Sequence, residues 1–144
     1  EIRIRDWSSD VCSSDLMKAA VAKGGAVWLG SQTDDQLKEA YQTATMLVYP
    51  SLYEGFGLPP IEAMACGCPV VCSKTASLPE VCGEAAEYFD PTSEEDISAK
   101  ISYLLGNEDR RKELSRAGIA KVEDYSWARM AEETAAVYRR AVEG

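Results

Sequence analysis

The sequence alternates short apolar runs with stretches of helical periodicity, and this alternation limits the folds that the chain can adopt. Four segments of four residues each are typical of strands: those at 26–29, 46–49 and 69–72 are apolar, and the one at 86–89 is apolar except for Glu87. Helical patterns follow Thr33 or Asp34 and Pro59. Short strands that alternate with helices and short connections predict a parallel α/β sheet. We therefore expect a Rossmann-like fold in which helices flank the sheet.

The last third of the chain is expected to be helical. Ser93 with Asp96 resembles a capping box, Asn107 or Asp109 can begin a second helix, and Ser126 can cap a third. Apolar residues recur at helical spacing after each of these positions. Three consecutive helices therefore follow the last predicted strand.

Length and charge exclude several classes of protein. A chain of 144 residues forms one domain at most, and it can bury a sizeable core. The formal charge is -9 and histidine is absent, which argues against a nucleic-acid partner because phosphate contacts need clustered basic residues. No apolar run approaches the roughly 20 residues that span a bilayer, and no signal peptide is recognisable.

The five cysteines do not indicate a metal site. They lack a C-x-x-C pair, and no histidine is available to complete a zinc site. Small core thiols in a reducing compartment explain four of them better. We therefore expect no metal.

Residues 1–16 differ from the rest of the chain. They contain a near-duplicate, Ser-Ser-Asp-Val followed by Ser-Ser-Asp-Leu, and their composition is that of a loop or a disordered tail. Residues 6–16 also resemble a translated sequencing adaptor. We therefore expect a non-native or disordered leader at 1–16, and a partial domain at 17–144 that begins near Met17.

The segment from Tyr49 to Pro69 is the candidate ligand site. A strand leads into a loop that carries Glu54, and a helix that begins with prolines and carries Glu62 follows the loop. Ligands of open α/β sheets bind beyond the carboxyl ends of the strands, where this loop is expected. The segment therefore predicts a polar ligand site at the sheet edge.

Glycines and the helix start supply the remaining groups of this site. Gly55 and Gly57 expose backbone N–H groups, and the start of a helix favours an anion such as a diphosphate. Glu62 is expected in the first helical turn, where it can accept two hydrogen bonds from a vicinal diol such as a ribose. Glu54 is expected to meet a second group, which either bears a hydroxyl or develops positive charge.

Spacing alone leaves other interpretations open. A strand, a glycine loop and a helix can be simple connection chemistry, and neither G-x-x-x-x-G-K-[ST] nor G-x-G-x-x-G is present. A pair of carboxylates also occurs in glycoside hydrolysis. These residue types do not by themselves choose between an enzyme and a binding module.

The same segment closely resembles retaining glycosyltransferases of the GT-B fold, glycosyltransferase family 4. The resemblance rests on Pro50-Ser51, Tyr53-Glu54-Gly55-Phe56-Gly57-Leu58-Pro59-Pro60 and Glu62-Ala63-Met64-Ala65, with seven residues between the two glutamates. It extends from about Gly24 to the end of the chain. It implies the fold of a partial C-terminal donor-binding domain, in which residues 126–144 form the helix that crosses back to the partner domain.

The resemblance also implies a role for each residue of the site. Glu54 would lie against the donor sugar and stabilise an oxocarbenium-like transition state. Gly55, Phe56 and Gly57 would bind sugar hydroxyls or phosphate oxygens through their N–H groups, Leu58 would bind the diphosphate, and Glu62 the ribose. The implied reaction transfers a mannose- or glucose-type hexose with retention and without a metal or other cofactor.

The partners implied by the resemblance are a nucleotide-diphosphate sugar, a glycan or lipid-linked acceptor, and a missing N-terminal domain of the same enzyme. The implied location is the cytoplasm, at or near the inner membrane face. Half of a cleft cannot exclude water or position an acceptor, so we expect the fragment alone to be inactive. The alternative function is a non-catalytic nucleotide-sugar-binding or interaction domain of the same fold.

Overall fold

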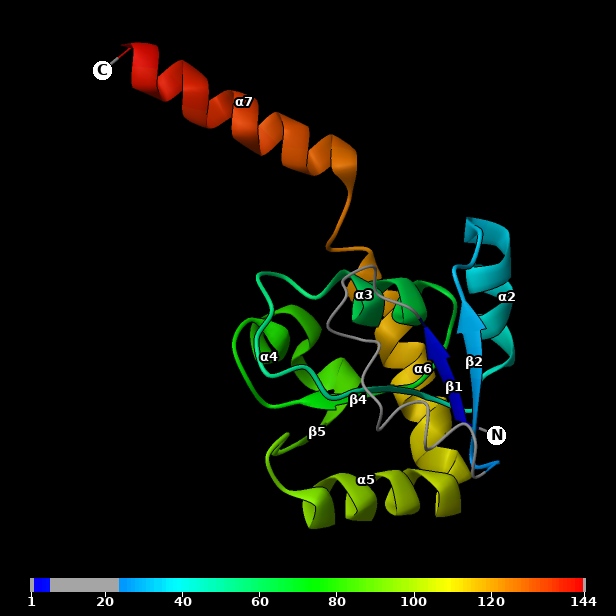
Figure 1. Ribbon diagram of the computed structural model, residues 1–144. Coiled ribbons are helices and arrows are strands. Elements are labelled where there is room, and N and C mark those ends of the chain that lie inside the picture. Colours follow the sequence, from blue (N-terminus) through cyan, green and yellow to red (C-terminus); the bar gives the residue numbers. More distant parts are fainter. Residues whose placement is uncertain (1, 6–23, 144) are drawn as a thin grey trace. The chain divides into compact units, whose positions relative to one another are not determined.

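The computed structural model describes residues 2–5 and 24–143, which belong to two compact units that divide between Glu39 and Ala40. The first unit contains two parallel strands, β1 (Ile2–Arg5) and β2 (Ala26–Gly30), which Figure 1 shows in blue. Helix α2 (Asp34–Thr43) begins in the first unit and ends in the second. Thr33 Oγ1 accepts from the N–H of Gln36, and Gln36 Oε1 accepts from the N–H of Thr33. This reciprocal capping box fixes the predicted helix start.

The expectation that residues 1–16 lack regular structure is wrong for Ile2–Arg5. These four residues form β1, in which Ile2 pairs with Ala26 and Ile4 with Trp28. The Ile-Arg-Ile-Arg alternation has the period of two that favours a strand, but the loop-like composition of the residues that follow outweighed it. Residues 6–16 and the expected start near Met17 lie outside the described residues.

The second unit is built on a three-stranded parallel sheet. The strands are β3 (Leu47–Tyr49), β4 (Val70–Ser73) and β5 (Ala86–Phe89), in the order β3-β4-β5. Tyr49 pairs with Cys72, and Ser73 pairs with Phe89. All three strands therefore end at one edge of the sheet, as the predicted parallel α/β fold requires.

Six helical segments follow β3 in the described residues, and the last three begin where their capping residues predict. They are α3 (Leu58–Ala65), α4 (Leu78–Cys82), the 3-10 turn η2 (Gly83–Ala85), α5 (Glu94–Gly106), α6 (Glu108–Val122) and α7 (Trp127–Glu143). Ser93, Asn107 and Ser126 each accept the N–H three residues later, at 3.1, 2.9 and 3.1 Å. These caps explain why the polar residue before each apolar pattern marks a helix start.

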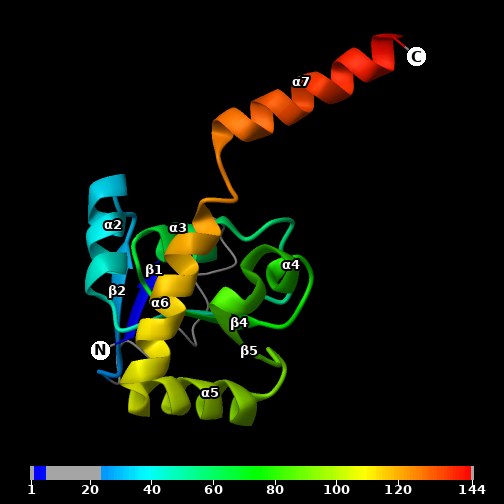
Figure 2. The same cartoon turned by 180° about the vertical axis from the view of Figure 1, so that it is seen from behind.

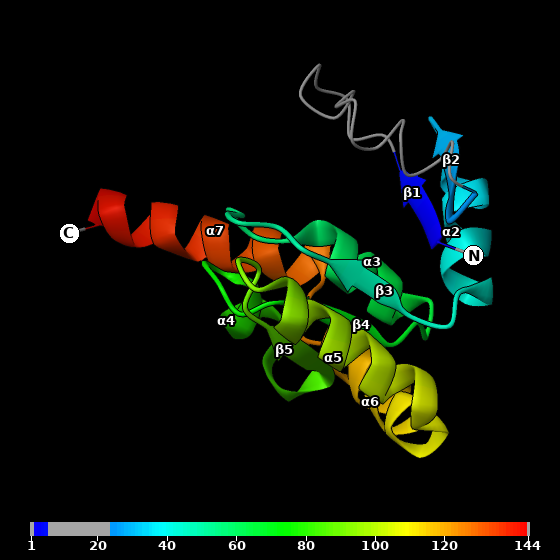
Figure 3. The ribbon, with the colours of Figure 1, turned by 60° about the horizontal axis from the view of Figure 1, so that its bottom comes forward.

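Helix α3 packs on α6 (Figure 2), and α5 lies beside α6 (Figure 3). The buried cluster consists of Val71 on β4, Phe89 on β5, Leu104 on α5 and Leu114 on α6. Because α3 leaves the edge of the sheet and lies on α6, the core fixes the helix that carries Glu62.

Helix α7 carries large apolar side chains that are exposed to solvent. Trp127 is 79% exposed and Tyr138 is 69% exposed. The role predicted for residues 126–144, a crossover to another domain, stays a prediction.

Candidate functional site

The loop between β3 and α3 is closed by a glycine that no other residue replaces easily. Gly57 has φ +96°, and it is the residue from which α3 begins. A Cβ at this position would lie 2.6 Å from Cδ2 of the buried Leu78. The left-handed backbone and the close side chain together explain why the sequence has glycine here.

Glu62 does not lie in the first turn of α3, so that prediction is wrong. The helix begins at Leu58, which makes Glu62 its fifth residue and places it in the second turn. Pro59 and Pro60 occupy the second and third positions and have no N–H. Among the first three helical residues only Leu58 can donate to an anion, and the dipole argument for Glu62 weakens accordingly.

The carboxylate of Glu54 is half-buried and accepts two side-chain hydrogen bonds. The Tyr49 hydroxyl lies 2.5 Å from Glu54 Oε1, and Ser51 Oγ lies 2.9 Å from the same oxygen. Tyr49 is the last residue of β3, so the sheet fixes its backbone. Burial, and then the hydrogen bond to Glu54, raise the pKa of Tyr49 well above its usual value, which keeps the phenol protonated.

The carboxylate of Glu62 is exposed, and a buried tyrosine lies beside it. The Tyr41 hydroxyl is 3.4 Å from Glu62 Oε2, and Tyr41 is 8% exposed. Tyr41 belongs to the end of α2 that lies within the second unit. This contact joins Glu62 to a second helix.

Three hydroxyls from the β4 side hold the backbone of the loop. The carbonyls of Tyr49 and Ser51 accept at 3.3 Å, and that of Glu54 accepts at 3.0 Å. The donors, in the same order, are Ser73, Thr75 and Ser77. These side-chain hydrogen bonds continue past the point where the main-chain hydrogen bonds between β3 and β4 end. They therefore hold the loop next to the chain that follows β4.

The side chain of Phe56 turns toward the end of α6. Its ring meets the ring of Tyr125 edge to face, with 5.5 Å between the centroids. The Tyr125 hydroxyl in turn donates to the carbonyl of Val81 at 3.0 Å. Phe56 therefore anchors the loop through its side chain, which leaves its backbone N–H as the group for a ligand.

The structure thus places all six predicted site residues on one strand–loop–helix segment, Glu54 to Leu58 in the loop and at the helix start, and Glu62 on α3. Sequence reasoning missed the hydroxyl partners Tyr41, Tyr49 and Ser77. The alternation Ser73-x-Thr75-x-Ser77 was the available signal, because a period of two continues the face of a strand.

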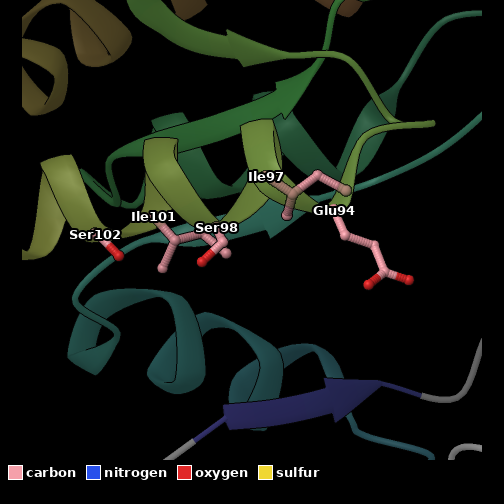
Figure 4. A pocket seen from close by; sticks show the side chains of 5 residues that line it. All are labelled: Glu94, Ile97, Ser98, Ile101 and Ser102. Atoms are coloured by element: carbon pink, nitrogen blue, oxygen red, sulfur yellow. The ribbon is translucent and has the colours of Figure 1, made fainter.

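Two depressions elsewhere on the second unit do not contain these carboxylates. One, of about 260 Å³, lies on a single face of α5 and is lined by Glu94, Ile97, Ser98, Ile101 and Ser102 (Figure 4). The other, of about 480 Å³, includes Thr45 and Pro69, which precede β3 and β4, and therefore lies at the opposite edge of the sheet. The Glu54 site, at the carboxyl edge, is separate from both depressions.

The part of the chain that the structure describes contains no group of three histidine, cysteine, aspartate or glutamate side chains suited to a metal ion. Within the same residues, no helix has the length and apolarity needed to cross a membrane.

The second unit is a parallel α/β fold in which Glu54 follows the carboxyl end of β3 and Glu62 lies on the next helix. Residues 6–121 match the family described as Glycosyl transferases group 1, and the chain belongs to this family. The match begins inside the segment predicted to be a leader.

A similar protein is O-antigen chain mannosyltransferase B from Escherichia coli. It is 40% identical over 135 residues, which cover 94% of this chain and 35% of that protein. The chain therefore spans about a third of this relative's length.

Two solved structures share the fold. The C-terminal domain of a glycosyl transferase group 1 family protein from Francisella tularensis has a TM-score of 0.67 at 23% identity, covering 83% of this chain and 64% of that one. Sucrose-phosphate synthase from Thermosynechococcus elongatus has a TM-score of 0.81 at 24% identity, covering 98% of this chain and 38% of that one. The predicted GT-B C-terminal fold is thereby confirmed.

Proposed function

We propose that the chain is the donor-binding part of a retaining hexosyltransferase. The donor is a nucleotide-diphosphate sugar of the mannose or glucose type, and the acceptor is a glycan or a lipid-linked sugar. The family match supports the class of reaction, and the relative named as a mannosyltransferase supports the hexose. We place the reaction in the cytoplasm, near the inner membrane face, as part of the same proposal.

One observation carries the proposal most directly. A half-buried carboxylate, Glu54, is held by two hydroxyls next to the exposed backbone of Gly55 and the N–H of Leu58. A fixed negative charge can stabilise positive charge that develops on a sugar ring, while N–H groups suit phosphate oxygens. The carboxylate therefore suits the sugar ring, on which positive charge develops during transfer. The amide N–H groups on the same short segment suit the negatively charged diphosphate.

We propose for the site residues the roles that the family resemblance implies. Glu54 lies against the transferring sugar and stabilises an oxocarbenium-like transition state. The N–H groups of Gly55, Phe56 and Gly57 bind sugar hydroxyls or phosphate oxygens, and Leu58 binds the diphosphate. Glu62, exposed on the second turn of α3, accepts from the ribose diol. The reaction needs no metal in this proposal.

We also propose that the 144-residue chain alone does not transfer sugar. The chain spans about a third of the length of the mannosyltransferase that it matches, and transfer requires that water be excluded and an acceptor be positioned. Formation of a glycosylated product by the purified chain would contradict this part of the proposal.

Donor binding can be tested by NMR on the chain itself. The amide resonances of Gly55, Gly57 and Leu58 are followed while guanosine, uridine and adenosine diphosphate sugars are added, with free mannose and free glucose as controls. We expect at least one nucleotide sugar to move these three resonances, and the free hexoses to leave them in place. If no nucleotide sugar perturbs residues 54–62 of the folded chain, the proposal is wrong.

A further inference from the structure

The hydroxyls of two residues converge on a single oxygen of Glu54. Tyr49 and Ser51 lie 2.5 and 2.9 Å from Oε1, and all three side chains are at least partly buried. Within the described residues no hydrogen bond reaches Oε2. The two oxygens of this carboxylate therefore have different environments.

The proton of Ser51 has a choice of acceptors, and the carboxylate is the better one. Ser51 Oγ also lies 3.2 Å from the carbonyl of Tyr53, which is farther than its distance of 2.9 Å from Glu54. Hydrogen bonds to ionised acceptors are also shorter and stronger than those to neutral ones. Ser51 therefore donates to Glu54.

The backbones of these three residues are held as well as their side chains. The carbonyls of Tyr49 and Ser51 accept from Ser73 and Thr75, and Ser77 Oγ lies 3.0 Å from the carbonyls of both Glu54 and Phe56. In addition, the pairing of Tyr49 with Cys72 places it at the rigid end of β3. The phenol thus projects from the sheet, and rigid elements hold functional groups more precisely than loops do.

We propose that Tyr49 and Ser51 are positioning residues, which hold Glu54 by Oε1 so that Oε2 is left to contact the donor sugar. This inference rests on the proposed function. It assigns the contact with the sugar to one carboxylate oxygen, and it makes the affinity for the sugar half of the donor depend on two hydroxyls that never touch the donor. Burial and the neighbouring carboxylate raise the pKa of Tyr49, so its phenol donates throughout the physiological range.

The contact itself can be tested without a ligand. A short, half-buried hydrogen bond from a phenol to a carboxylate protects the hydroxyl proton from exchange, so we expect a downfield proton resonance for Tyr49. Tyr49→Phe and Glu54→Gln should each remove this resonance. Tyr53→Phe is the matched control, because Tyr53 lies in the same loop and is 82% exposed. A spectrum that Tyr49→Phe leaves unchanged overturns the proposal.

The consequence for the donor is tested by comparing a nucleotide sugar with the matching nucleoside diphosphate. Tyr49→Phe and Ser51→Ala should each weaken binding of the nucleotide sugar by about tenfold, the size of a hydrogen bond to a charged group. Affinity for the nucleoside diphosphate should stay within twofold, and Tyr53→Phe should change neither affinity. Equal losses for both ligands, or no loss for the sugar, overturn the proposal.

The hydroxyl-proton spectrum and the binding comparison together distinguish a failure of this inference from a failure of the proposed function. If the folded wild-type chain binds no nucleotide sugar, the donor assignment fails while the hydroxyl resonance still shows whether Tyr49 holds Glu54. If the sugar binds and the resonance is absent from the wild-type spectrum, the positioning role fails and the donor assignment stands.

Discussion

Met64 of α3 and Gly118 of α6 are in such close contact that a Cβ at position 118 would lie 2.9 Å from Met64 Cγ and 3.1 Å from its Cβ. Met64 is 1% exposed and Gly118 is buried. The absence of a side chain at 118 therefore allows α3 to approach α6. Because Glu62 also lies on α3, this contact holds the helix that carries the proposed ribose-binding residue against α6.

Gly118→Ala should destabilise the chain. Overpacking against Met64 costs about 1–3 kcal/mol, and the helix propensity that alanine gains offsets about 1 kcal/mol of it. Urea unfolding should therefore show a net loss of about 1 kcal/mol. Gly106→Ala is the matched control, since Gly106 ends α5 and a Cβ there meets nothing within 4 Å. A stability of Gly118→Ala equal to or above that of the control contradicts the close packing.

Gly57→Ala should disturb the start of α3. Alanine at φ +96° is strained, and its Cβ would clash with the buried Leu78. We expect a loss of about 1–3 kcal/mol in thermal or urea unfolding. Gly55→Ala, where a Cβ meets nothing within 4 Å, should cost much less. Equal losses in the two variants would show that Gly57 is not the constrained glycine.

Tyr88 should make the stability of the chain fall at alkaline pH. Its hydroxyl donates to the carbonyl of Gly83 at 2.6 Å, and burial raises the pKa of Tyr88 well above the ordinary value for a tyrosine. The folded chain then keeps a proton that the unfolded chain releases, so stability decreases as pH rises above about 10. Unfolding free energies between pH 8 and 11 measure this slope.

The variant Tyr88→Phe should show a shallower alkaline decrease than the wild type, although the lost hydrogen bond lowers its stability at pH 8 by about 1 kcal/mol. Tyr138→Phe is the control, because Tyr138 is 69% exposed on α7. An identical slope for the wild type and Tyr88→Phe would contradict the role of this group.

Much of the fold could be predicted from local patterns. The strands β3, β4 and β5 are short and mostly apolar segments. Three helices start directly after Ser93, Asn107 and Ser126, whose side chains accept the N–H three residues later. Strand β1 was missed because four alternating residues precede a segment of loop-like composition.

The site was predictable only in part. Glu54 and the glycines are local features of the sequence, and the family resemblance gave them roles. Glu62 lies in the second turn of α3 because the helix begins at Leu58, directly after the left-handed backbone of Gly57. The partners Tyr41 and Tyr49 were assigned to secondary structure, and their hydroxyl contacts depend on tertiary packing that periodicity does not encode.

The central claim is that the segment of Glu54 and Glu62 binds the nucleotide and sugar of a donor, with Glu62 on the ribose diol. The most direct measurement compares the affinities of a nucleoside diphosphate and its 2′,3′-dideoxy analogue for the wild type, Glu62→Ala and the exposed control Glu80→Ala. We expect the wild type and Glu80→Ala to prefer the diol by about tenfold, which corresponds to about 1.4 kcal/mol, and Glu62→Ala to bind both ligands equally. A diol preference that survives in Glu62→Ala would contradict the account.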